Sequence, residues 1–246
     1  RMLSNSEGLP TNAVFGFMNI YLRLLEEEKP DGVCVAFDRP EPTFRRQKYD
    51  GYKAQRKGMP EELALQMPYV KQLLGLLGVH CYEQPGWEAD DILGTMARIC
   101  GEKGVECTVV TGDRDSLQLV SDTTSVRYVT AKGAQGADII YTPEVFKAEY
   151  GFEPIKLIDL KALMGDSSDN IPGCPGVGEK TAVKLIQEFG SIDNLLANTD
   201  KLKGALQRKV QENRDMIEFS RFLATIKTDV EVEFDEESLR RKPIDE

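Results

Sequence analysis

The sequence predicts an α/β protein in which a mainly parallel sheet is flanked by helices and is followed by a smaller unit made only of helices. Short apolar strands alternate with amphipathic helices up to about residue 150, as in parallel sheets joined by helical crossovers. From about 150 to 227 the chain shows helices separated by glycine and proline, and no strand pattern. We therefore expect an α/β domain over residues 1–150, a helical unit over 151–232, and a charged tail or linker over 233–246.

In the first domain, the spacing of apolar residues predicts the type of each element. Apolar residues recur at helical spacing in the opening stretch, at Val14, Met18, Tyr21 and Leu25. The stretches GVCVAFD and VECTVVTGD are short apolar runs that end on an aspartate and are typical of buried strands. The expected order is helix 11–27, strand 32–38, helix 63–77 capped by Gly78, strand 79–83, helix 88–100 and strand 105–113.

The pattern changes after Thr142-Pro143, a pair typical of a helix N-cap and first helical residue. Residues 157–170 predict a helix and a turn, and residues 179–189 predict a further helix. The stretch VEVEF, residues 230–234, alternates as an edge strand does.

Composition narrows the class of protein. With 41% hydrophobic and 29% charged residues, and no apolar run near the roughly 20 residues of a membrane span, the chain is typical of soluble globular proteins. Five scattered cysteines without a C-x-x-C pair or a secretory signal favour reduced thiols in a cytosol. The single histidine, His80, argues against His-based zinc sites and Ser-His-Asp catalysis.

Residues 39–58, here called the basic segment, stand out in a chain whose net charge is −10. The segment carries seven basic residues against two acidic ones, interleaved with Phe44, Tyr49 and Tyr52. Cations follow phosphates and aromatic rings offer stacking surfaces, so this mixture favours contact with a single nucleic-acid strand. A solvated surface helix is the structural alternative.

Eight acidic residues lie at strand ends and helix starts, where ligands of α/β proteins gather. Converging carboxylates repel one another unless a cation neutralises them, and oxygen ligands without His or Cys select Mg²⁺ or Mn²⁺. Solvated acids in the first turns of helices are the alternative. The eight are Asp38, Glu88, Asp90, Asp91, Asp113, Asp115, Asp166 and Asp169.

The stretch Gly173 to Thr181 is close to a phosphate-binding P-loop, but Glu179 interrupts the spacing between glycine and lysine. A P-loop also follows a buried strand, whereas residues 157–170 predict a helix and a turn. Three interpretations remain open: a nucleotide-binding loop, a purely structural hairpin, and a site that binds the DNA backbone through amides at the start of a helix. The last is favoured, with Lys180 and Lys184 near phosphates.

Six motifs in order resemble the 5′-nuclease domain of bacterial DNA polymerase I, which belongs to the flap-endonuclease group. They are VAFD, YDGYKAQRKGMP, PGWEADDILGT, VTGDRDSLQLVSD, MGDSSDNIPGCPGVGEKTAVKLIQEFGS and LATI. The resemblance runs from about Leu3 to Phe234 and is specific as an ordered set. It implies a PIN-like α/β domain with a helical arch at about 39–60, and a helix-three-turn-helix unit with a glycine hairpin at 172–178.

The resemblance also implies roles for individual residues. The eight acids match the family's site for two Mg²⁺ or Mn²⁺ ions, and Lys53 and Arg56 match its catalytic basic residues. Tyr52 matches an aromatic residue that stacks on a displaced base, and the hairpin at 173–178 matches a potassium site. The expected DNA-binding residues are Arg45, Arg46, Tyr52, Gly176, Gly178, Lys180, Thr181 and Lys184.

The implied function is a structure-specific 5′ nuclease, a 5′-3′ exonuclease or flap endonuclease, that cleaves DNA at single-strand/duplex junctions by a two-metal mechanism. The expected setting is replication and repair in the bacterial cytoplasm at the nucleoid, with a covalently linked polymerase domain and no membrane partner. The family normally starts with a central strand that ends in an aspartate and precedes RMLSNSEGL, so weakened metal binding and nuclease activity are expected for this chain. The alternatives are a junction-binding module with an impaired metal site and a PIN-type RNA nuclease.

Overall fold

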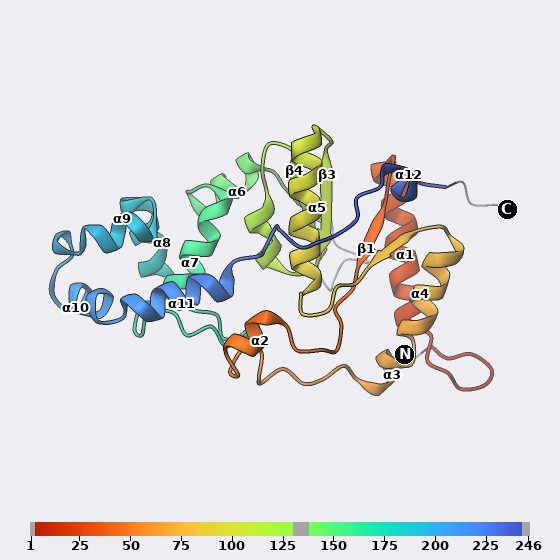
Figure 1. The fold of residues 1–246 in the computed structure, drawn as a ribbon, viewed down its shortest axis with the longest axis horizontal. Helices are drawn as coiled ribbons and strands as arrows, with labels where there is room; N and C mark the ends of the chain where they lie inside the picture. The colour runs from red at the N-terminus through yellow and green to blue at the C-terminus, as the bar shows by residue number, and fades with distance from the viewer. Residues whose placement is uncertain (1–2, 130–137, 243–246) are drawn as a thin grey trace.

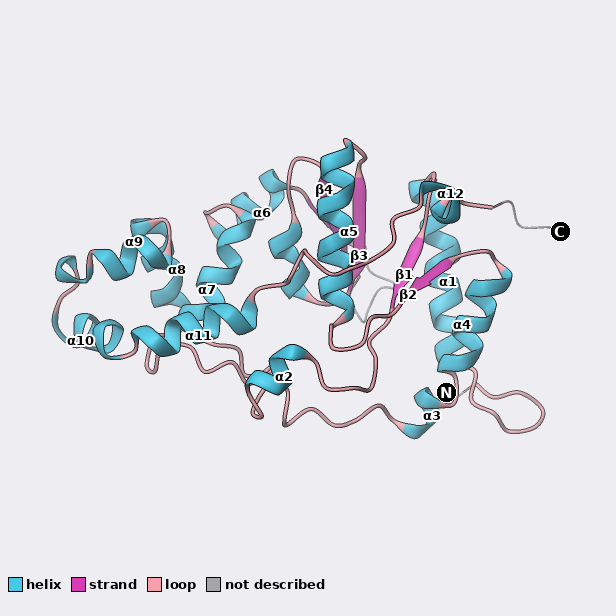
Figure 2. Ribbon diagram, in the orientation of Figure 1, coloured by secondary structure: helices cyan, strands magenta, loops and turns pink. Residues whose placement is uncertain are grey.

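The structure is a computed structural model that describes residues 3–129 and 138–242. The predicted alternation of helices and strands is present up to residue 141 (Figure 1, Figure 2). The elements are α1 (Asn12–Glu28), β1 (Cys34–Ala36), α2 (Phe44–Lys48), α3 (Glu61–Ala64), α4 (Met67–Leu76), β2 (His80–Tyr82), α5 (Ala89–Lys103), β3 (Cys107–Thr111), the 3-10 helix η1 (Arg114–Leu119), β4 (Thr124–Tyr128) and β5 (Ile139–Tyr141).

Two features of this region differ from the sequence prediction. The helix predicted over 63–77 is divided into α3 and α4, and Pro68 lies in the first turn of α4. Proline suits a first turn but interrupts a helix interior, so a new helix begins there. Strands β4 and β5 are additional to the predicted set.

The strands form two small sheets. β1 pairs with β2 in parallel, with Cys34 opposite His80. β3 pairs with β4 in parallel, and β4 pairs with β5 in antiparallel register. The mainly parallel pairing is thus confirmed, but over residues 3–129 and 138–242 no strand joins the two sheets at the free edges of β1 and β3.

Helix α5 contacts both sheets and carries acidic residues at its first turn (Figure 1). Glu88 and Asp91 form a reciprocal capping box that satisfies free amides at the helix start. Gly104 ends the helix at φ 69°, a conformation that glycine adopts without steric cost. Ile92 and Met96 of α5 pack against Tyr82.

The second part of the chain is helical over the residues described between 142 and 229, as predicted. Its core is continuous with that of the first domain, because Val109 and Leu117 belong to the same buried cluster as Leu160 of α7 and Ile186 of α8. The helices are α6 (Pro143–Tyr150), η2 (Pro154–Lys156), α7 (Leu157–Met164), α8 (Glu179–Phe189), α9 (Ile192–Ala197), η3 (Thr199–Lys201), α10 (Gly204–Glu212) and α11 (Arg214–Ala224).

The C-terminal segment corrects two expectations. Residues 230–234 form no strand, although Val230 packs into the cluster around α5. Residues 235–242 are no free tail, because α12 (Glu236–Leu239) is docked on the first domain. The amide of Val33 donates to Leu239 O at 2.8 Å and the amide of Arg241 donates to Asp31 O at 2.8 Å.

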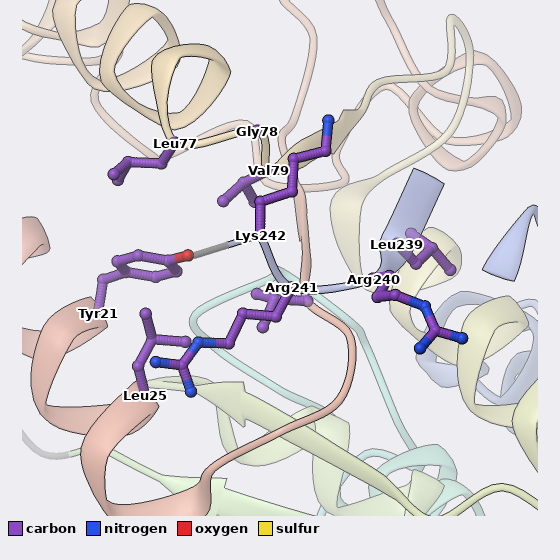
Figure 3. Close-up of a pocket in the computed structure, with 10 residues that line it drawn as sticks. Tyr21, Leu25, Leu77, Gly78, Val79, Leu239, Arg240, Arg241 and Lys242 are labelled. Atoms are coloured by element: carbon purple, nitrogen blue, oxygen red, sulfur yellow. The ribbon is translucent and has the colours of Figure 1, made fainter. Parts of the chain in front are cut away.

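The docked segment lines a small pocket together with Tyr21 and Leu25 of α1 and with Val79 (Figure 3). Residues 243–246 of the expected tail lie outside the described residues. Over the described ranges, we find no helix with the length and apolar character that a membrane crossing requires.

Candidate active site

The predicted acids come from strand ends and helix starts. Asp38 follows β1, Asp113 follows β3, and Asp90 lies in the first turn of α5. Asp38 Oδ1 accepts a hydrogen bond from the amide of Ala89 at 2.8 Å, which ties the end of β1 to the start of α5. The carboxyl end of β1 therefore meets the N-terminus of α5, as expected for ligand-binding ends of α/β strands.

Four residues form what we call the Lys53 cluster: Lys53, Arg56, Glu88 and Asp169. Lys53 Nζ lies 2.7 Å from Glu88 Oε1 and 3.7 Å from Asp169 Oδ2, and Arg56 pairs with Asp169. Lys53 has a left-handed backbone with φ 53°, and its amide donates to Asp169 O at 2.9 Å. Such a conformation is costly for a residue with a side chain and is often found at functional sites.

A second group, the Lys161 cluster, consists of Lys161, Asp115 and Asp166. The ammonium of Lys161 contacts Asp115 and lies 2.5 Å from Asp166 Oδ2. The Ser168 hydroxyl also donates to Asp166 Oδ1 at 2.6 Å. The sequence reasoning missed Lys161, and the available signal was a lone cation inside the apolar helix LIDLKALM.

Burial and neighbouring groups shift the pKa values of three acids of the site in different directions. Burial, reinforced by the charge of Asp113, raises the pKa of Asp90 to about 7. Burial also raises the pKa of Asp115 to about 6, despite the nearby ammonium of Lys161. Burial opposes ionisation of Asp166, but hydrogen bonds from Lys161 and Ser168 outweigh it and lower the pKa of Asp166 to about 2.

The carboxylate oxygens of the site are the kind of ligand that a hard divalent cation prefers. The nearby carboxylates offer oxygen atoms alone, and burial, followed by the charge of Asp113, raises the pKa of Asp90 to about 7. Across residues 3–129 and 138–242, however, no three Asp, Glu, His or Cys side chains already converge as a metal site. Lys53 and Lys161 hold the carboxylates instead, so a metal ion would replace their ammonium groups.

Two predicted DNA-binding residues and one predicted acid are buried. Asp91 is fully buried, and its carboxylate faces Arg45 rather than the other acids. Arg45 is only 2% exposed, so its guanidinium is not available to DNA. Tyr52 is 4% exposed and its hydroxyl donates to Glu88 Oε2 at 3.1 Å, so its ring is not available to stack on a base. Arg45 and Tyr52 of the basic segment are thus part of the buried structure that supports the site.

The other expected DNA-binding residues are accessible to different degrees. Lys180 and Lys184 are exposed on α8, and Thr181 is half-buried there. Gly178 is the N-cap of α8. The half-buried Arg46 donates to Tyr52 O at 2.9 Å, so it stabilises the basic segment.

The glycine hairpin is attached to the helix that carries Lys161. Gly173 requires glycine, because φ is 65° and an added Cβ would lie 2.2 Å from the Gly165 nitrogen. The amide of Cys174 donates to Leu163 O at 2.7 Å, and the amide of Gly173 donates to Ser220 Oγ at 2.9 Å. The hairpin is therefore packed directly against α7, close to the carboxylates in sequence and in space.

Comparisons with known proteins agree with this geometry. Residues 1–151 match the 5′-3′ exonuclease N-terminal resolvase-like domain, and residues 152–246 match the 5′-3′ exonuclease C-terminal SAM fold. DNA polymerase I of Bacillus subtilis (strain 168) is 46% identical over 233 residues, covering 94% of this chain and 26% of that protein. DNA polymerase I of Caldicellulosiruptor bescii is 41% identical over 240 residues, covering 98% of this chain and 28% of that protein. The chain thus spans about a quarter of the length of these relatives.

Solved structures share the fold. T5 5′-exonuclease with bound zinc superposes with a TM-score of 0.70 at 22% identity, covering 85% of this chain and 80% of that chain. The catalytic core of Rad2 in complex with DNA substrate gives a TM-score of 0.59 at 18% identity, covering 95% of this chain and 75% of that chain. An α/β domain joined to a helical unit, the predicted fold class, is thereby confirmed.

Proposed function

The chain belongs to the 5′-3′ exonuclease family, and from that membership we propose that it is a structure-specific 5′ nuclease. The proposed substrate is DNA with a junction between single strand and duplex, such as a 5′ flap or a nick. The helical unit would hold the duplex by its backbone, so recognition should depend on shape with little sequence preference. The product would carry a 5′-phosphate.

The observation that carries this proposal is the direct attachment of the glycine hairpin to the acidic site. Gly178 is the N-cap of α8, and the amide of Cys174 donates a hydrogen bond to Leu163 O of α7. Helix α7 also carries Lys161, which contacts two carboxylates of the site. Amides at a helix start bind phosphate, and converging carboxylates bind divalent cations. Phosphate binding and phosphate hydrolysis are thus supported within one short stretch of chain.

We propose Mg²⁺ or Mn²⁺, two ions, as the cofactor. Zinc on T5 5′-exonuclease supports a divalent ion in this fold. Two such ions supply, when bound, an activated water and charge stabilisation for the leaving oxygen. Asp91 is left out of the proposed ligands because Arg45 holds it. The ligands, direct or through water, would be Asp38, Glu88, Asp90, Asp113, Asp115, Asp166 and Asp169.

Lys53 and Arg56 have a distinct role in this proposal. Both are held by Glu88 or Asp169, at the open side of the site. With these carboxylates engaged by a metal ion, Lys53 and Arg56 would stabilise charge on the scissile phosphate.

We further propose that the hairpin binds K⁺ through backbone carbonyls. Lys209 Nζ donates to Gly176 O at 3.2 Å, so a hairpin carbonyl already accepts a cation. A melting temperature of the free protein that rises more with KCl than with equal tetramethylammonium chloride would support this site.

Cleavage of a labelled 5′-flap DNA, with and without Mn²⁺, tests the proposed function. Release of the flap only with metal is the expected result. Tight junction binding without cleavage in both Mg²⁺ and Mn²⁺ would instead favour the junction-binding alternative. Faster cleavage of single-stranded RNA than of the flap would favour an RNA nuclease.

The wider setting is also a proposal. The relatives that cover this chain are whole DNA polymerases I from bacteria. We therefore propose that the chain works in replication and repair in the bacterial cytoplasm, linked to a polymerase domain.

A further inference from the structure

Arg45 is a buried cation that the proposed chemistry leaves without a role. It lies in the basic segment, yet it is 2% exposed and is among the largest fully buried side chains. Burying a guanidinium is costly unless carboxylates and carbonyls replace the hydrogen bonds that it made to water. The identity of its partners therefore indicates what its burial accomplishes.

The first partners are carboxylates at the start of α5. Nη1 lies 2.8 Å from Glu88 Oε2 and 2.8 Å from Asp91 Oδ2, and Nη2 lies 2.7 Å from Asp91 Oδ1. The paired contacts to Asp91 are the fork-like geometry that only a guanidinium makes. Arg45 therefore fixes the direction of Glu88, whose other oxygen faces Lys53.

The remaining partners are carbonyls at the end of α11. Nε donates to Leu223 O at 3.1 Å, and Nη2 donates to Thr225 O at 2.5 Å. Terminal carbonyls of a helix lack partners within the helix, so Arg45 caps α11. All five N–H groups of the guanidinium are thus used within the protein.

Helix α11 connects this contact to the hairpin. Its Ser220 accepts a hydrogen bond from the amide of Gly173, and α11 packs along α7. In Figure 1, α2 lies where the end of α11 approaches the start of α5. The guanidinium therefore connects α11, which contacts the hairpin, to the N-terminus of α5, where Glu88 lies.

We propose that Arg45 is a positioning residue that couples helix α11, which contacts the hairpin through Ser220, to the carboxylate of Glu88. The proposal rests on the proposed nuclease function. DNA held by the hairpin fixes α11, and Arg45 transmits that position to Glu88. Lysine at this place would keep the charge but has three donors on one nitrogen, so it cannot hold the carboxylates and both carbonyls together.

The test compares Arg45→Lys with the wild type in three measurements. Single-turnover flap cleavage should fall about 10- to 100-fold, because a small misplacement of a reacting group has that effect. The Mn²⁺ concentration for half-saturation, followed by water-proton relaxation without DNA, should rise about tenfold. Flap affinity in Ca²⁺ should stay unchanged, since Arg45 has no surface for DNA.

A fourth measurement addresses the coupling itself. Bound flap DNA should lower the Mn²⁺ half-saturation concentration of the wild type, and this effect should shrink in Arg45→Lys. Phosphate oxygens of the DNA contribute equally to Mn²⁺ binding in both proteins. Any difference between their two DNA effects therefore reports on the contact that Arg45 makes between α11 and Glu88. An identical DNA effect in both proteins would overturn the proposal.

Arg127→Lys is the matched control. Arg127 is also a buried arginine, paired with Asp138 at 2.8 Å and with Glu27 and Glu28, and none of these three carboxylates is a proposed metal ligand. It should lose thermal stability and keep cleavage and Mn²⁺ binding. If Arg127→Lys lost cleavage as strongly as Arg45→Lys, the effect would be general instability and the proposal would be wrong.

The outcomes separate the two proposals. A wild type that binds flap DNA without cleaving it overturns the nuclease function, and the Mn²⁺ measurements then still decide on Arg45. A cleaving wild type and an equally active Arg45→Lys overturn only the role of Arg45. Weaker flap binding with an unchanged single-turnover rate would show a direct DNA contact and would also overturn it.

Discussion

Replacing Lys161 by methionine removes the cation that separates two carboxylates of the site. Lys161 is 8% exposed and contacts Asp115 and Asp166. Methionine has a similar length, so the change is mainly electrostatic. Loss of one partner from a buried ion pair costs about 3–5 kcal/mol. At about 2–4 °C per kcal/mol for a chain of this size, the melting temperature should fall by roughly 6–20 °C.

Thermal unfolding by circular dichroism, in EDTA and in Mn²⁺, checks this reasoning. An ion at 100 times its dissociation constant stabilises the folded state by about 2.7 kcal/mol. The gain with Mn²⁺ should be larger for Lys161→Met than for the wild type, because no ammonium competes for the carboxylates. Lys161→Arg keeps the charge and is the control. A fall of under about 3 °C in EDTA, or an equal gain with Mn²⁺ in both proteins, would refute the electrostatic role.

Three further predictions concern other parts of the site. Lys53→Ala should lower single-turnover flap cleavage about 100-fold, far more than DNA binding, and an unchanged rate would refute its role. Burial and neighbouring carboxylates raise the pKa of Asp90 to about 7, so a proton competes with the metal below that pH. Mn²⁺ affinity should therefore rise about tenfold per pH unit between about pH 6 and 7, more steeply below pH 6 where Asp115 is protonated as well, and then level off. In Asp90→Asn it should level off near the pKa of Asp115, about 6; pH-independent binding would contradict this. In Gly173→Ala the added Cβ would lie 2.2 Å from a backbone nitrogen, whereas in Gly176→Ala it would meet only a flexible lysine end at 2.4 Å. Urea unfolding should show a clearly larger loss for Gly173→Ala, and about 1–3 kcal/mol of backbone strain for Gly176→Ala; equal losses would count against the packing argument.

The parts of the fold that sequence predicted are those determined by local pattern. Apolar spacing and helix-capping residues located α1, α5 and α8 to within a few residues. This works because helix caps and amphipathic faces depend only on residues that are close in sequence. The rule that ligands bind beyond the carboxyl ends of strands also predicted that Asp38 lies close to the start of α5.

The parts that sequence missed depend on distant partners. Residues 230–234 alternate like a strand, yet they find no strand partner among the described residues. Arg45 lies among exposed cations in sequence, and only the approach of Leu223 and Thr225, far along the chain, buries it. Lys161 likewise acquires its role from Asp115, which another element supplies. Local charge patterns do not contain this information.

The ion pairs of Lys53 and Arg56 bear on the order of events in the proposed cleavage. Lys53 Nζ lies 2.7 Å from Glu88, and Arg56 pairs with Asp169, so carboxylates of the site neutralise both cations. A metal ion bound by these carboxylates would release both cations at the open side, where a substrate phosphate would be the next anion. We therefore expect any loss of flap affinity in Lys53→Ala to be present in Ca²⁺ and absent in EDTA. Fluorescence anisotropy with labelled flap DNA measures both conditions, and an equal loss in each would show that Lys53 meets the phosphate before the metal enters.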